Sequence, residues 1–284
     1  MIKGIDHIVL AANSLKDAAG QWEQLGFKVT PYARHPWGTE NRLVQLNGSF
    51  LEILAIGEDA ELTESSEGVF SFGAFNRDFL LKGEGASMLV LDSTSAKDDR
   101  AIFKAAGLAE FAPFSFERIA VSPEGEERQV AFDLTFTQDP LGVETGFFTC
   151  HNKFPENFWK ADYQSHPNSV TDLSEIIFVA DDPADHHEFL KGFSGQRMAR
   201  LSSLGVEMET SRGLIRVLSP SAYESLYGLK ALSARSGLRL AALGFKAKDR
   251  NKFAEYARKL GGTQYGAQWV VGPDKLAGVA VICS

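Results

Sequence analysis

The sequence predicts an α+β fold built from four copies of one unit, in which a strand and a helix are followed by three strands (β-α-β-β-β). Residues 1–56 carry the apolar, capping and turn residues of such a unit in the right order. The same order returns three more times along the chain, progressively blurred. With 284 residues, the chain is long enough for two ordinary domains with buried cores.

The first unit shows the pattern most clearly. An apolar strand at 4–13 leads into a helix that Ser14 can cap, with Asp17 three residues further on. Apolar residues then recur at helical spacing, and Gly26 stands where a left-handed glycine would end the helix. Three strands are expected next, at 27–30, 41–46 and 50–56, with a hairpin turn at Asn47 and Gly48 between the last two.

The remaining copies divide the chain into two halves. They are expected at 85–151, 173–220 and 236–284. The aromatic-rich segment 58–85 between the first two copies should pack on the core or line a pocket. We place the domain boundary at about residue 170, which gives the two domains 1–170 and 171–284.

Composition excludes several classes of function. The apolar fraction of 44% and the charged fraction of 23% are typical of a globular protein. A net charge of −8 without a Lys/Arg cluster argues against nucleic-acid binding, and no apolar run is long enough to span a membrane. Cys150 and Cys283 are too few for a disulfide framework. Because the first strand starts within a few residues of Met1, we expect no signal peptide and a cytoplasmic location.

A duplicated unit with His7 on its first strand and Glu52 on its last resembles the vicinal-oxygen-chelate superfamily. This superfamily includes glyoxalase I, extradiol ring-cleaving dioxygenases, metal-dependent thiol transferases and metal-free binding proteins. The stretches HPWGTENRLVQLNGSFLEIL (35–54) and FFTCHNKFPENFW (147–159) are similar to its glyoxalase-like group, as is the later HPN (166–168). The resemblance covers the first 170 residues well and the rest by pattern. It implies that the four units pair into two half-open barrels.

The resemblance also implies a metal site. His7 and Glu52 match the metal-ligand positions of the first unit. Imidazole and carboxylate together suit Fe, Mn, Zn, Co or Ni, and open coordination positions admit substrate oxygens. Within the apolar run FLEIL, the Glu52 carboxylate would be costly to bury without a cation or hydrogen-bond partners. The alternative is a core histidine at His7 and a solvent-facing Glu52.

The second unit departs from the family pattern. Ser87 stands where a ligand histidine or glutamine often stands. His151, at the end of the last strand, is our candidate for a third metal ligand that completes a triad of two histidines and one carboxylate. Alternatively, His151 contacts the substrate or acts as the catalytic base that deprotonates it. A register shift of one residue would turn His151 to the other face of the sheet.

The C-terminal half lacks a ligand set. Glu175 stands where His7 stands, and Arg216 stands where Glu52 stands. We therefore expect a metal-free barrel that covers the N-terminal cavity or makes a dimer contact. Further residues are expected to bind substrate around the N-terminal cavity, although each of them could instead have a turn or core role. They are His35, Trp37, Asn41, Phe75, His166 and Asn168.

These features predict a metal-dependent enzyme that acts on a small substrate with adjacent oxygens. The divalent metal ion (Fe, Mn, Zn, Ni or Co) would stabilise negative charge on those oxygens as a Lewis acid. Isomerase or lyase, ring-cleaving dioxygenase and transferase chemistry all remain open. The alternative is a metal-free protein of the same fold that binds or sequesters a small molecule. We expect no nucleic-acid or membrane partner, and either a monomer or a homodimer.

Overall fold

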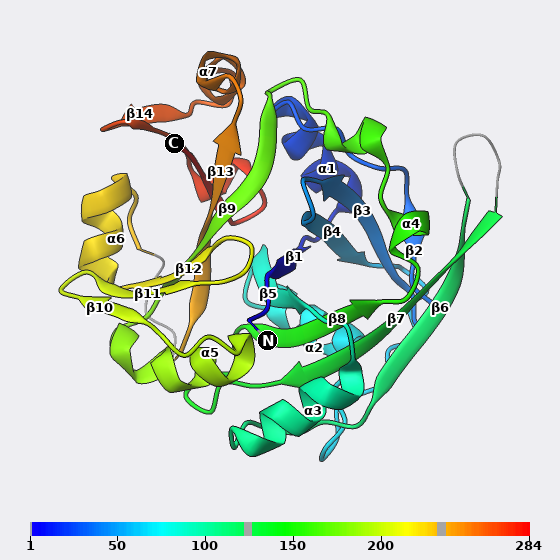
Figure 1. Ribbon diagram of the computed structural model, residues 1–284. Coiled ribbons are helices and arrows are strands. Elements are labelled where there is room, and N and C mark those ends of the chain that lie inside the picture. Colours follow the sequence, from blue (N-terminus) through cyan, green and yellow to red (C-terminus); the bar gives the residue numbers. More distant parts are fainter. Residues whose placement is uncertain (1, 122–126, 232–236) are drawn as a thin grey trace.

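The computed structural model describes residues 2–121, 127–231 and 237–284. It confirms the predicted α+β fold, because two curled eight-stranded sheets each contain two β-α-β-β-β units. Figure 1 shows the N-terminal strands on the right and the C-terminal strands on the left.

The N-terminal sheet is formed by residues up to 152. Its strands are β1 (Ile5–Ala11), β2 (Ala33–Arg34), β3 (Thr39–Gln45), β4 (Phe50–Ile56), β5 (Gly85–Asp92), β6 (Phe114–Val121), β7 (Glu127–Thr137) and β8 (Gly146–Asn152). The helices of this half are α1 (Leu15–Gln24), α2 (Phe72–Leu80), α3 (Ala96–Ala105) and α4 (Pro155–Phe158), followed by the 3₁₀ turn η1 (Ala161–Gln164).

The C-terminal sheet repeats this arrangement. Its strands are β9 (Val170–Val179), β10 (Arg200–Ser202), β11 (Gly205–Glu209), β12 (Leu214–Leu218), β13 (Arg239–Ala247), β14 (Thr263–Tyr265), β15 (Gln268–Val271) and β16 (Ala280–Cys283). Its helices are α5 (His187–Ser194), α6 (Pro220–Tyr227) and α7 (Arg250–Lys259), with 3₁₀ turns η2 (Pro183–His186) and η3 (Pro273–Lys275).

Both sheets have the same strand order. It is β2-β3-β4-β1-β5-β8-β7-β6 in the first sheet and β10-β11-β12-β9-β13-β16-β15-β14 in the second. The central strands β1 and β5 are antiparallel, whereas each of them is parallel to the last strand of its own unit. Each sheet is therefore a pair of units joined along their first strands.

Local signals in the first unit act as predicted. The Ser14 side chain accepts a hydrogen bond from the Asp17 amide at the start of α1, and Gly26 has a φ of +85° just after it. The expected strand at 27–30 does not form, and β2 lies further along the chain. The reason is that the Lys28 amide donates to the ring of His166 instead of to a neighbouring strand. Helices α2 and α6 were not predicted.

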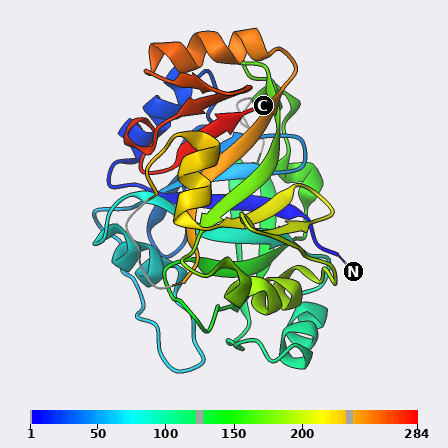
Figure 2. The ribbon, with the colours of Figure 1, turned by 90° about the vertical axis from the view of Figure 1, so that its left-hand side faces the viewer.

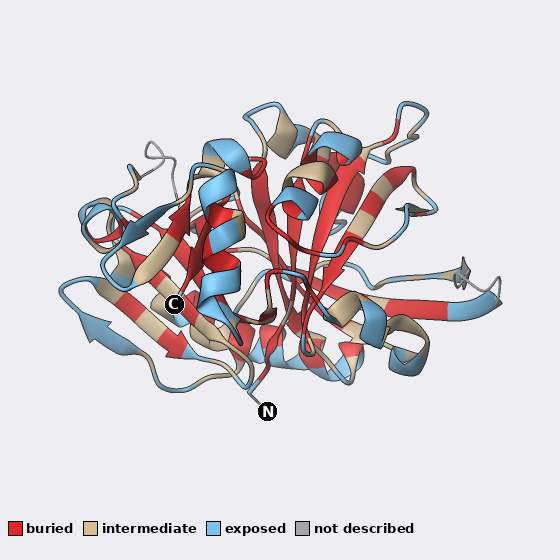
Figure 3. Ribbon diagram, turned by 90° about the horizontal axis from the view of Figure 1, so that it is seen from above, coloured by how far each residue is buried: buried red, intermediate tan, exposed pale blue. Residues whose placement is uncertain are grey.

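The two sheets pack back to back. The largest core cluster contains outward-facing residues of both halves, such as Leu10 of β1, Trp22 of α1 and Phe245 of β13. Two smaller clusters belong to one half each and fill the two concave faces. Buried residues run along the central strands, and the helices turn exposed faces outward (Figure 3). Figure 2 shows the same ribbon from the side of the C-terminal half, with α6 in front and α7 along the top. None of the described helices is long and apolar enough to cross a membrane.

Candidate active site

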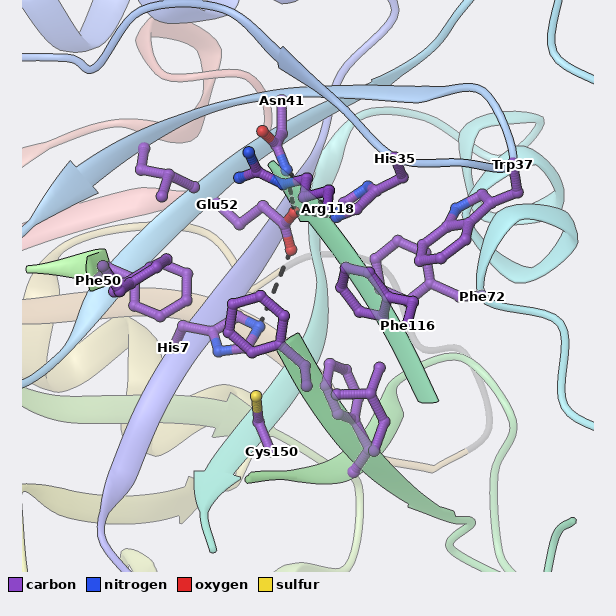
Figure 4. A pocket seen from close by; sticks show the side chains of 15 residues that line it. His7, His35, Trp37, Asn41, Phe50, Glu52, Phe72, Phe116, Arg118 and Cys150 are labelled. Carbon is purple, nitrogen blue, oxygen red and sulfur yellow. Dashed lines mark hydrogen bonds and ion pairs between the residues drawn. The ribbon is translucent and has the colours of Figure 1, made fainter. Parts of the chain in front are cut away.

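A cavity of about 50 Å³ lies on the concave face of the N-terminal sheet. Its walls are mostly aromatic, and the polar side chains that reach it come from β1, β3, β4, β6, β8 and the loop before β3. Figure 4 shows this arrangement. The lining residues are His7, His35, Trp37, Asn41, Leu43, Phe50, Glu52, Phe72, Phe116, Arg118, Phe132, Leu134, Phe148, Cys150 and Phe158.

All of these residues precede β9, so the C-terminal half lines no part of this cavity. Of the two roles expected for that half, covering the cavity is wrong, and making a dimer contact stays a prediction. The C-terminal half packs instead against the opposite face of the N-terminal sheet, because the apolar outward faces of the two sheets form one core. It therefore does not close the cavity.

His7 and Glu52 face each other across this cavity. In the parallel pair β1 and β4, Glu52 lies opposite Val9, two residues beyond His7, so all three side chains point to the same face. The distance from His7 Nε2 to Glu52 Oε2 is 3.8 Å, and both residues are about nineteen-twentieths buried, with exposed fractions of 4% and 5%. The ring of His7 stacks on Phe50 with centroids 4.3 Å apart.

The Asp6 carboxylate determines which nitrogen of His7 faces the cavity. His7 Nδ1 lies 2.7 Å from Asp6 Oδ2. Because a carboxylate accepts hydrogen bonds, Nδ1 is the donor, and Nε2 is the nitrogen that faces Glu52. Such a carboxylate–histidine pair is the usual support of a metal-binding histidine.

Asn41 connects Glu52 with His35. Its side-chain Nδ2 donates to Glu52 Oε1 at 2.6 Å and lies 3.3 Å from His35 Nε2. The other ring nitrogen of His35, Nδ1, is 2.8 Å from Thr39 Oγ1. The pKa of His35 is lowered to about 4, mainly by burial. The charge of Glu52 opposes this shift, and the charge of Arg118 adds to it. His35 is therefore a neutral ring at pH 7 that holds Asn41, and through it Glu52, in place.

Arg118 is a cavity residue that sequence analysis did not identify. On β6 it is preceded at alternate positions by Phe114 and Phe116, and its partner in the antiparallel ladder is Val130 of β7, which lies in the concave core. This alternation along FSFER could have revealed a cavity-facing cation. Burial lowers the pKa of Arg118, and the charge of Glu52 opposes this.

His151 does not join His7 and Glu52. On β8 the cavity is lined by Phe148 and Cys150, and burial raises the pKa of the Cys150 thiol well above its ordinary value. His151 lies in a larger open cleft of about 810 Å³, which we call the outer cleft. There His151 Nδ1 is 3.8 Å from Asp133 Oδ2. The single-residue step between Cys150 and His151 accounts for this difference.

The second unit adds no metal-ligand side chain at the position of the expected ligand. Ser87 points away from the cavity and donates to Asn76 Oδ1 at 2.6 Å. The core of the concave face receives Met88 and Val90 from β5 instead. Hydrophobic side chains therefore replace the ligands that the family pattern places on this strand.

The other predicted substrate-binding residues divide into two groups. His35, Trp37 and Asn41 line the cavity, whereas Phe75 lies in a separate pocket beside Phe70 and Phe79. The structure uses His166 and Asn168 to hold the backbone: His166 bonds to the Lys28 amide and the Gln45 carbonyl, and Asn168 bonds to the Leu25 carbonyl and the Val170 amide.

The donor atoms at the cavity fit a divalent ion with two protein ligands. His7 Nε2 and Glu52 Oε2 have no hydrogen-bond partner among the described residues, and the two atoms face each other. Within the same part of the chain, no group of three or more His, Cys, Asp or Glu side chains could hold a metal ion. A metal ion here would therefore need further ligands from water or substrate.

The C-terminal sheet carries different side chains at the same register. Glu175 lies opposite Leu214 as His7 lies opposite Phe50, and Arg216 matches Glu52 in the same way. Arg216 Nε is 3.3 Å from Glu175 Oε2. An internal guanidinium thus balances the carboxylate in this half.

Comparison with known proteins identifies one matching family of domains. Residues 5–193 match the family model described as a glyoxalase-like domain. A search among curated protein sequences finds no significant match.

Three solved structures share the fold across the whole chain. A hypothetical protein from Staphylococcus aureus has a TM-score of 0.65 at 12% identity, covering 100% of this chain and 99% of that one. The 2,2′,3-trihydroxybiphenyl 1,2-dioxygenase of Sphingomonas wittichii has a TM-score of 0.55 at 11% identity, with 100% and 90% covered. The Mn(II)-bound glyoxalase of Novosphingobium aromaticivorans has a TM-score of 0.55 at 10% identity, with 99% and 81% covered.

Proposed function

The chain belongs to the glyoxalase-like domain family of the vicinal-oxygen-chelate superfamily, and we propose that it is a metal-dependent enzyme acting on a small substrate with adjacent oxygens. His7 and Glu52 are the proposed metal ligands. Isomerase or lyase chemistry and ring-cleaving dioxygenase chemistry both begin with two substrate oxygens beside such an ion, so the proposal covers both.

One observation carries this proposal: His7 Nε2 and Glu52 Oε2, two atoms of the kind that bind metals, face each other on the wall of the cavity. His7 Nε2 and Glu52 Oε2 are 3.8 Å apart. With neither a proton nor a metal ion between them, the imidazole and the carboxylate would direct lone pairs at each other, which is unfavourable. The Asp6 hydrogen bond orients the His7 ring so that Nε2 faces the cavity.

The surrounding residues would hold this pair rigid and dry. Asn41 fixes the Oε1 atom of Glu52 and leaves Oε2 toward His7. Phe50 stacks on His7, and Phe148 packs against the edge of the same ring. A bound divalent ion would supply Lewis acidity for the negative charge that develops on substrate oxygens. Aromatic walls that exclude water would strengthen that electrostatic effect.

The test is a Mn²⁺ titration followed by isothermal calorimetry. It compares the native chain with Glu52→Gln and with Glu175→Gln, the matched change in the C-terminal half. We expect about one saturable site in the native chain and in Glu175→Gln, and an affinity at least about tenfold weaker in Glu52→Gln. Catechols and thiol adducts of 2-oxoaldehydes are then the first substrates to assay. No saturable binding of Mn²⁺, Fe²⁺, Ni²⁺ or Zn²⁺ by the native chain would refute the proposal.

A metal-free binding protein is the second candidate. The observation in its favour is that the described residues supply two ligands of the required kind, with hydrophobic side chains on β5 where others are expected. An aromatic cavity with a few converging polar groups is also a typical small-molecule site. Ligand binding that is unchanged by EDTA and by Glu52→Gln would favour this function.

A further inference from the structure

Arg118 brings a positive charge to the cavity and has no role in the proposed metal site. Its guanidinium has no hydrogen-bond or ion-pair partner among the described residues, and the carboxylate that acts on it electrostatically is Glu52. Figure 4 shows it reaching from β6 toward the level of Glu52 and Asn41. A guanidinium is always charged and carries five donors, so a half-buried one without an acceptor from the described residues favours an anionic ligand beside it.

A second polar atom in the same wall lacks a partner. Asn41 is almost fully buried, with an exposed fraction of 3%, and its Oδ1 accepts no hydrogen bond although its Nδ2 is engaged by Glu52. Rotating the amide by 180° would place Oδ1 against the Glu52 carboxylate, so the observed orientation is required. A ligand with a hydroxyl group could donate to Oδ1.

The charges of the site also favour an anion. The charges of Glu52 and Arg118, which line the same cavity, offset each other. If a divalent ion binds as proposed above, the cavity gains two positive charges. A ligand with a carboxylate would then offset part of this positive charge, which a neutral diol would not.

The volume limits the size of the ligand. A cavity must offer about 10–15 Å³ on this measure to hold one water molecule. The 50 Å³ found here corresponds to room for about three to five water molecules, which limits the ligand to a few non-hydrogen atoms unless the aromatic walls move. The remaining walls are apolar rings such as Phe116 and Phe132, which suit a short alkyl end.

We propose that the substrate is a small 2-hydroxy or 2-oxo carboxylate, whose carboxylate is bound by Arg118 and whose neighbouring oxygen faces Asn41 and the His7–Glu52 pair. This inference rests on the proposed function for the role of the adjacent oxygens. The binding of the carboxylate by Arg118 does not require the metal.

The experiment measures the affinity of lactate and of propane-1,2-diol, its neutral analogue, by ligand-observed NMR titration. Each ligand is titrated into the native chain, Arg118→Met and Arg118→Lys, once in EDTA and once with Mn²⁺. Arg200→Met is the control, because Arg200 is an exposed arginine of the C-terminal half. We expect the native chain and Arg200→Met to prefer lactate by about tenfold or more. Arg118→Met should lose this preference, and Arg118→Lys should retain part of it.

The outcomes separate this inference from the proposed function. A native chain without preference for lactate in either condition, or an unchanged preference in Arg118→Met, would overturn the inference even if Mn²⁺ binds. A preference that depends on Arg118 in EDTA would support it even if no metal binds. Phenyllactate serves as the size probe, and an affinity equal to that of lactate would overturn the limit on size.

Discussion

Arg216 of β12 and Glu175 of β9 form an ion pair, with Nε 3.3 Å from Oε2, at the register that holds Glu52 and His7 in the N-terminal sheet. The two halves thus surround a carboxylate on the concave face with different side chains. In the C-terminal half a side chain of the protein supplies the cation, and Tyr223 and Tyr227 of α6 fill the concave face. In the N-terminal half the carboxylate of Glu52 faces His7 Nε2, and among the described residues it makes no direct ion pair with a guanidinium.

The first prediction concerns this ion pair. Burial raises the pKa of Glu175, and Arg216 opposes the shift, so Arg216→Met should leave a partly buried carboxylate uncompensated. We expect the free energy of unfolding in urea to fall by about 1–3 kcal/mol. The double variant Glu175→Leu/Arg216→Met should recover most of the loss. A double variant less stable than Arg216→Met would contradict the account.

The second prediction concerns pH and His35. Its pKa is about 4 in the folded protein and about 6.5 in the unfolded chain, so the unfolded chain binds more protons between these values. The contribution of His35 to stability is present above pH 6.5 and is lost as the pH falls toward 4, by at most about 3 kcal/mol. Urea unfolding at pH 4.5 and 7 should show a smaller pH dependence in His35→Leu than in the native chain. The more exposed His187 provides the control variant His187→Asn, which should behave as the native chain does.

The third prediction concerns the two cysteines. Burial raises the pKa of the Cys150 thiol well above its ordinary value and that of Cys283 to about 11, so both are thiols at pH 8. Neither should react with a thiol-specific reagent within minutes in the folded protein, and both should react in denaturant. Fast labelling of the native chain at Cys150, identified by peptide mass, would show that the cavity opens to solvent.

The fourth prediction concerns Asp6, which acts on the proposed metal site through His7. Removing its carboxylate in Asp6→Ala should free the His7 ring to rotate, so that Nε2 is no longer held toward the cavity. Mn²⁺ affinity should fall by about 10–100-fold. The fall should be absent in Asp98→Ala, which changes an aspartate of the same outer cleft. Equal affinities in native and Asp6→Ala proteins would argue against His7 as a ligand.

Sequence patterns predicted the repeated unit and its first strand because both depend on local signals. Alternation along β1 and β4 places His7 and Glu52 on one face, and the cap at Ser14 starts α1 as expected. The position of His151 was beyond such reasoning, since one residue decides which face of β8 it occupies.

Long-range contacts explain the other differences. His166 and Asn168 form hydrogen bonds with backbone groups of residues more than 100 positions away. Asn168 also accepts a hydrogen bond from the amide two positions further along the chain. No local sequence pattern indicates the long-range contacts. Arg118 enters the cavity because β6 pairs with β7 at the edge of the curled sheet. Its alternation with two phenylalanines was visible in the sequence, but the cavity it faces is created by other strands.

The most direct measurement is a crystal of the native chain soaked in Mn²⁺, with anomalous diffraction recorded near the manganese edge. We expect one strong anomalous peak bonded to His7 Nε2 and Glu52 Oε2, and none at Glu175 and Arg216. A parallel crystal of Glu52→Gln should lack the peak. A native crystal without a peak at His7 and Glu52, at a Mn²⁺ concentration that saturates any site found by calorimetry, would contradict the central claim.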